Sequence, residues 1–244
     1  MSRRLVPLVA LALLAAAPLA AESPSKTVEK TLPLAADGRL TVDTYKGRVQ
    51  VTVWDRAEAS IRAVVTPDGR CDTAAELVER TAIRIDGGGR EVRVETDYDD
   101  LPKSVFSFSS DCSSRPFVSY EIRMPRSATL KVDDYKSRIS VDGVSGPVEI
   151  ESYKGTMRLA GLAAPLEVDT YKGDVVAEFE SLHGPVRVET YKGEVELVFP
   201  KGAPVDLDDR VGRRGSLRAE LTESRSGTPV SVETHKGTIR LRTR

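Results

Sequence analysis

The chain has 244 residues, a formal net charge of −1 and 40% hydrophobic residues, and its acidic and basic side chains are interleaved. This balance creates no positive field, so we expect no nucleic-acid partner. The sequence holds only two histidines and none of the common motifs of hydrolases, zinc proteases, phosphate loops or dinucleotide sites. We therefore predict no catalytic residues, no metal site, no cofactor and no enzymatic activity.

Residues 1–21 have the layout of a secretory signal peptide. Arg3 and Arg4 precede an apolar run from Leu5 to Ala17, and small residues follow up to Ala21. The run is shorter than the about 20 apolar residues of a membrane-spanning helix, although an uncleaved anchor remains an alternative. We expect an exported protein, located in the periplasm, at the cell surface or in the medium, with no integral membrane segment after cleavage.

Residues 22–125 are predicted to form an N-terminal β region. Alternating valines at 49–53 and apolar residues at 61–65 indicate strands, a short helix is expected to end near Arg80, and a strand is expected from Phe117 to Pro125. The region contains both cysteines of the chain, Cys71 and Cys112. In an exported protein such a pair predicts a disulfide, worth about 3–4 kcal/mol; two free buried thiols are the alternative.

A repeated Thr-Tyr-Lys-Gly turn organises the chain, mostly within residues 126–244. Its aromatic residue is found at Tyr45, Tyr135, Tyr153, Tyr171, Tyr191 and His235. A lysine follows in every copy, at Lys46, Lys136, Lys154, Lys172, Lys192 and Lys236, and then a glycine except at Ser137. Residues 205–219 form a degenerate further copy without the turn. We expect the glycines to supply a positive φ in the turn.

The flanks of the turn alternate with a period of two. Apolar residues stand five and three positions before the ring and four and six positions after it, and an acid stands two positions before it. This pattern predicts two strands per copy, with the apolar positions inward and the acids outward. We expect those acids, which include Glu151, Asp169 and Glu189, to neutralise the neighbouring lysines.

Two all-β architectures satisfy this pattern. In a β-solenoid, each copy is one coil and equivalent residues stack about 4.8 Å apart; in an antiparallel meander, each copy is a hairpin and equivalent residues lie about 10 Å apart. The near-identical turns and the length of the copies favour a repetitive, right-handed β-helix-like solenoid, with the short helix in the N-terminal β region.

The "YEIRMP" strand that ends at Pro125, followed by units such as "ESYKGTMRL", resembles the bacterial putative-adhesin family, an adhesin-like domain of unknown function in exported envelope proteins. The resemblance implies a right-handed β-helix-like fold, a role in the envelope or in adhesion, and no catalytic residues. The typical turn of that family is of a Ser-Gly-Asp type, and Tyr-Lys-Gly replaces it here.

We predict a ligand-binding edge made of Tyr135, Tyr153, Tyr171 and Tyr191 with Lys154, Lys172 and Lys192. If the units stack, this edge suits sugar rings or peptides, so an envelope polysaccharide or an envelope protein is the expected partner; packing of the tyrosines for stability alone is the alternative. An envelope-stress regulator that acts through a protein partner is a second hypothesis. A carbohydrate-active enzyme is less favoured, because identical repeats cannot give two carboxylates different pKa values.

Overall fold

The computed structural model describes residues 23–70, 72–101 and 115–244. It contains one short helix, α1 (Ala74–Arg80), and these strands: β1 (Lys26–Trp54), β2 (Glu58–Thr66), β3 (Ala82–Asp97), β4 (Phe117–Pro125), β5 (Thr129–Asp142), β6 (Val148–Leu162), β7 (Leu166–Phe179), β8 (Val186–Lys192), β9 (Val195–Phe199), β10 (Pro204–Glu220), β11 (Thr222–Glu223) and β12 (Thr228–Thr243). The predicted all-β class with one short helix is confirmed. The signal peptide and the cysteines Cys71 and Cys112 lie outside the described residues and stay predictions.

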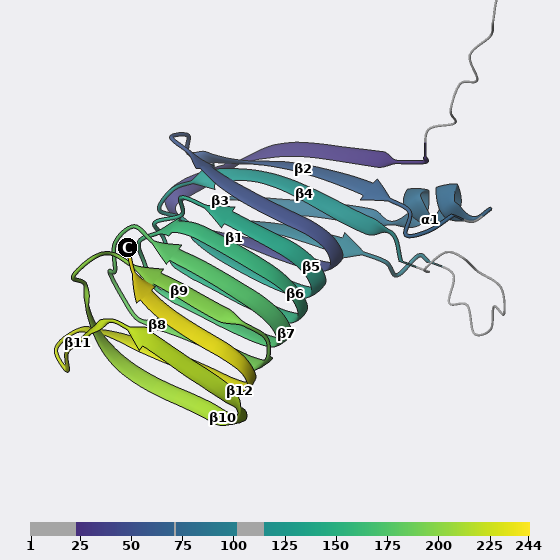
Figure 1. The fold of residues 1–244 in the computed structure, drawn as a ribbon. Helices are drawn as coiled ribbons and strands as arrows, with labels where there is room; N and C mark the ends of the chain where they lie inside the picture. Colours follow the sequence, from purple (N-terminus) through teal and green to yellow (C-terminus); the bar gives the residue numbers. More distant parts are fainter. Residues whose placement is uncertain (1–22, 71, 102–114) are drawn as a thin grey trace, which may run out of the picture.

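The strands form one large sheet in the order β11-β10-β12-β8-β7-β6-β5-β1-β2-β4, in which β3 also pairs with β1, and β9 with β7 and β12. Successive copies of the repeat pair in parallel and in register (Figure 1). Ile150, for example, lies between Val132 and Val168, which are its equivalents in the neighbouring copies. Among the described strands, antiparallel pairing involves only β2, with β1 and β4. The sheet continues across the predicted boundary at residue 125, because β1 pairs with β5.

The core follows the predicted alternation. The four inward positions of the first copy, Leu40, Val42, Val49 and Val51, are all fully buried, and their equivalents in β5 to β9 and β12 are at most 2% exposed. Because the copies are in register, each inward position forms a continuous apolar row through the molecule. Burial of such side chains contributes about 1.5–3 kcal/mol each, so the rows are the main source of stability.

The chain order and the spatial order of the units differ at both ends of the stack. Residues 39–54 of β1 lie between β5 on one side and β3 with β4 on the other. The C-terminal strand β12 is inserted between β8 with β9 and the degenerate copy β10. The degenerate copy therefore forms the end of the stack, where its many exposed positions meet solvent instead of another unit.

A further repeat unit, which the sequence pattern did not reveal, is formed by β3 and β4. Val92 and Val94 pair with the inward positions before the first ring, and Tyr120 and Ile122 pair with those after it. The unit is hidden in the sequence because the chain from 98 to 116 is inserted where the other units have their turn.

The described residues contain no helix long and apolar enough to cross a membrane.

The glycine of the turn is required by close packing more than by its φ angle. Gly47 and Gly237 have positive φ angles of 141° and 134°, but Gly155, Gly173 and Gly193 do not, so the predicted reason is wrong for these three. A Cβ atom on Gly193 would lie 1.9 Å from the carbonyl oxygen of Gly173 in the preceding unit. The turns at these glycines are thus packed directly on the backbone of their neighbours, where an added side chain has no room; Ser137 is the one copy that carries a side chain at this position.

We predict that Gly193→Ala lowers the free energy of unfolding by about 3 kcal/mol, as expected for an overpacked core. The matched control is Gly202→Ala, where φ is +75° but no atom lies within 4 Å of the added Cβ; its expected cost is about 1 kcal/mol. Chemical denaturation of both variants measures the difference. Equal costs would contradict close packing as the reason for the repeated glycine.

Candidate functional site: the ring column and the lysine groove

The six aromatic residues of the repeat form one continuous column, which we call the ring column: Tyr45, Tyr135, Tyr153, Tyr171, Tyr191 and His235. Successive ring centroids are 4.6, 4.9, 5.1, 5.0 and 4.9 Å apart, and neighbouring planes are within 15° of parallel. The structure therefore brings the four predicted tyrosines together. Each of these four side chains is 39–43% exposed.

The stacking determines which parts of the rings a ligand can reach. In a column of parallel rings, the faces are covered by neighbouring rings and the edges remain free. Within the described residues, no hydrogen bond is made by the phenol groups of Tyr135, Tyr153, Tyr171 and Tyr191. A ligand thus meets a row of ring edges and phenol hydroxyls that can donate and accept hydrogen bonds, whereas the faces expected to stack on sugar rings are covered.

The two ends of the column differ. At one end, Tyr98 packs edge-on against Tyr45 with centroids 6.1 Å apart, and the Arg115 guanidinium lies 4.1 Å from the Tyr45 centroid. The Tyr98 hydroxyl donates a hydrogen bond to the carbonyl of Pro116, and burial raises the pKa of this phenol. Sequence reasoning missed Tyr98 and Arg115 because they belong to the insertion in the unit formed by β3 and β4. At the other end, Gly212 of β10 lies against His235.

A groove of about 900 Å³ runs along the turns of five copies, from Gly47 to Gly193, and reaches β2 and β4 at one end; we call it the lysine groove. It is lined by Gly47, Arg48, Thr66, Phe117, Ser119, Lys136, Ser137, Arg138, Lys154, Gly155, Thr156, Lys172, Gly173, Asp174, Lys192 and Gly193. Lys136, Lys154 and Lys172 also line a smaller hollow of about 360 Å³ whose other walls include Tyr45 and Tyr135. The lysine row therefore stands between the ring column and the groove.

The lysine at the first turn differs from the others. Lys46 is buried, its Nζ atom lies 2.6 Å from Asp68 Oδ2, and it stands over the ring of Phe117. In contrast, no carboxylate of the described residues lies within 4.0 Å of Nζ of Lys136, Lys154, Lys172 or Lys192. Lys172 only approaches the ring of Tyr171, at 5.0 Å from the centroid. These four cations, three of which we predicted as ligand contacts, remain available.

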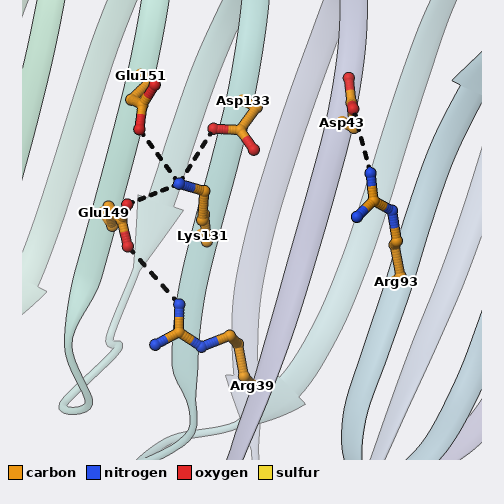
Figure 2. A network of polar contacts seen from close by, with 7 residues as sticks. All are labelled: Arg39, Asp43, Arg93, Lys131, Asp133, Glu149 and Glu151. Carbon is orange, nitrogen blue, oxygen red and sulfur yellow. Dashed lines mark hydrogen bonds and ion pairs between the residues drawn. The ribbon is translucent and has the colours of Figure 1, made fainter.

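The acids before the ring do not neutralise the turn lysines, contrary to our expectation. Four of the six pair instead with cations on their own face of the sheet (Figure 2): Lys131 contacts Asp133 and Glu151 at 3.5 and 3.2 Å, and also the neighbouring Glu149 at 2.7 Å. In the same way, Arg187 pairs with Glu189 and Arg93 with Asp43. The hydrogen bond to Glu149 is the main cause that raises the pKa of Lys131. This acidic face is thus partly balanced by its own cations, although Asp169 and Glu233 have no ion-pair partner among the described residues.

A row of short polar side chains lies beneath the turn, directly before each ring, and all are buried except the partly buried Asp134: Thr44, Asp134, Ser152, Thr170, Thr190 and Thr234. Asp134 accepts hydrogen bonds from the Ser137 backbone at 2.8 Å and from the Ser152 hydroxyl at 3.0 Å, and burial raises its pKa. This row could have been predicted from the sequence, because the residue directly before each ring is short and polar in every copy. The row is sealed beneath the turns, so it supports the site and is not part of its surface.

The ring column and the turn lysines beside it form two parallel rows. One row offers phenol groups for hydrogen bonds, and the other offers ammonium groups that have no carboxylate partner among the described residues. Of the acids considered for a glycosidase-like mechanism, Glu151 and Glu189 are held in ion pairs, whereas Asp169 has no such partner among the described residues. Among residues 23–70, 72–101 and 115–244, no three His, Cys, Asp or Glu side chains are grouped so that they could hold a metal ion. The arrangement is suited to binding an extended ligand along the stack.

We predict that Lys131→Gln lowers the free energy of unfolding by about 1 kcal/mol, because it leaves three carboxylates without their common cation. Lys154→Gln removes the same charge from the groove and should change stability by less than about 0.5 kcal/mol. Thermal and urea unfolding at low salt measure both. A larger loss for Lys154→Gln than for Lys131→Gln would contradict the assignment of the turn lysines as unpaired.

No family model and no curated protein matches this sequence. Among solved structures, a putative cell adhesion protein from Clostridium sporogenes aligns with 90% of this chain and 100% of its own, at 13% identity and a TM-score of 0.53. A putative adhesin from Bacteroides fragilis covers 90% of this chain and 97% of its own at 12% identity, with a TM-score of 0.32. A putative lipid binding protein from Parabacteroides distasonis covers 89% and 97% at 13% identity, with a TM-score of 0.31. The likeness to the first shows a shared fold.

Proposed function

We propose that this chain is a non-enzymatic binding module of the bacterial cell envelope, built as a β-solenoid whose Tyr–Lys edge contacts an envelope polysaccharide. The parallel pairing of the copies supports the solenoid, because it makes equivalent residues direct neighbours. In a meander they would be about 10 Å apart. The fold shared with a protein described as a cell adhesion protein, and the signal-peptide pattern, support the envelope role.

The observation that carries this proposal is the ring column, with four tyrosines about two-fifths exposed at a regular spacing of about 5 Å. A regular row of phenols matches a ligand that repeats along its own length, such as a polymer. Structural packing explains why the rings stack. It does not require hydroxyl groups at their edges, because phenylalanine stacks equally well.

The test is a pull-down of the protein on isolated polysaccharide, peptidoglycan and membrane fractions of the envelope. We compare it with a Tyr153→Phe/Tyr171→Phe/Tyr191→Phe variant, which keeps the stacked rings and removes three hydroxyls. We expect retention by the polysaccharide fraction, and about a tenfold loss in the variant, since each lost hydrogen bond is worth about 0.5–1.5 kcal/mol.

Circular dichroism and the melting temperature establish that the variant is folded. Retention of the variant equal to that of the parent, or no retention of either, would overturn the proposed use of the edge. Retention that depends on envelope proteins in the fraction would instead support the regulatory hypothesis.

A further inference from the structure

We infer that the lysine groove binds a linear polyanion, specifically a glycan segment that carries carboxylates on about four successive units. This inference rests on the proposed polysaccharide-binding function and names the chemical class of the ligand. It assigns the charged part of recognition to Lys136, Lys154, Lys172 and Lys192, beside the phenols of the ring column.

The groove concentrates positive charge on a chain that is nearly neutral. Its lining includes six cationic side chains and one carboxylate, Asp174. That carboxylate accepts a hydrogen bond of 2.9 Å from the backbone N–H of Glu194 and does not pair with a groove lysine. The whole chain carries a net charge of −1. A surface of this kind raises the local concentration of an anionic ligand.

Within the described residues, none of these four lysines forms an ion pair that would stabilise the fold. Lys136 pairs in register with Lys154, Lys154 with Lys172, and Lys172 with Lys192, so like charges stand directly opposite one another, which is destabilising. On the acidic face, by contrast, Lys131 and Arg187 stand in the same register as acids and pair with several of them. An external anion supplies the counter-charge that the turn lysines lack.

The groove follows the row of lysines across the stack, which suits a linear ligand. Its lining includes the glycines Gly155, Gly173 and Gly193, so an extended chain can lie close to the backbone. Thr66 and Phe117 of β2 and β4 line one end, where Lys46 is buried and paired with Asp68. The free lysine row thus begins at Lys136 and includes four groups within the groove. A glycan segment whose charges repeat at about the 4.8 Å spacing of neighbouring strands can meet all four groups at once.

The adjoining phenols favour a sugar polymer among polyanions. Lys136 and Lys154 line the hollow that also includes Tyr135 and Tyr153. A uronate unit carries both a carboxylate, which suits an ammonium group, and hydroxyls, which suit a phenol edge. Both kinds of partner repeat once per unit of the stack.

The test is isothermal titration of the full chain with oligogalacturonates of two to eight units, with neutral malto-oligosaccharides of equal length as the comparison. We expect binding of the uronates alone, an affinity that rises up to about four units and then levels, and weaker binding at high salt. The Lys136→Gln/Lys154→Gln/Lys172→Gln/Lys192→Gln variant should lose at least about tenfold in affinity without a lower melting temperature.

The matched control is Arg158→Gln/Lys201→Gln/Arg218→Gln/Arg225→Gln, which removes the same net charge from exposed side chains outside the groove. We expect its affinity to stay within about twofold of the parent. Equal losses in the two variants would overturn the inference, because binding would then follow net charge alone. Binding of neutral oligomers as tightly as uronates would also overturn it.

Failure of this inference can be separated from failure of the proposed function. If no uronate binds while tyrosine-dependent retention by the polysaccharide fraction persists, the polyanion assignment is wrong and the binding function stands. If that retention is absent as well, both are wrong. Lysine-dependent retention by phosphatidylglycerol vesicles without uronate binding would replace the glycan with a lipid surface.

Discussion

The parallel, in-register pairing of the repeat units is the constraint on which the rest of the structure depends. Because each residue pairs with its own equivalent, any side chain that repeats in the sequence becomes a row in space. Apolar positions become the continuous rows of the core, aromatic positions become the ring column, and the lysines after them become one wall of the groove. The turn glycines make this possible, since they let the backbone of each turn pack directly on the previous one.

The same constraint has an electrostatic consequence. A repeated charge must lie beside its own copies, and cations in the same register reduce the repulsion between them. On the acidic face, Lys131 and Arg187 supply such cations from the strands themselves. At the turn, Lys46 is the one lysine with a carboxylate partner among the described residues, Asp68. The positive charge of the other turn lysines coincides with the groove, and this coincidence is the reason to regard that surface as the binding edge.

The sequence predicted those features that depend on periodicity alone. The inward positions, such as Leu40 and Val168, and the succession of rings follow directly from a period of two around an invariant turn. Features that depend on how neighbouring strands and turns pack against one another were not predicted. The spacing of the glycines could not show that Gly193 faces a carbonyl oxygen of the neighbouring turn. The acids are close to the turn lysines in sequence, so we expected them to pair, but alternation along the strand puts Asp133 and Glu151 on the same face as Lys131. The unit of β3 and β4 was hidden because the chain from 98 to 116 interrupts it.

The central claim, in-register stacking of the repeats, is tested most directly by engineered disulfides. In a Cys71→Ser/Cys112→Ser background, Glu151→Cys with Asp169→Cys joins paired residues of β6 and β7, within the about 4.4–6.8 Å between Cα atoms that a disulfide allows. Glu151→Cys with Glu167→Cys is offset by two residues, at about 7–8 Å. Mild oxidation should close the first pair within the monomer and leave the second open. Failure of the first pair to close, or equal closure of both, would contradict the stacked register.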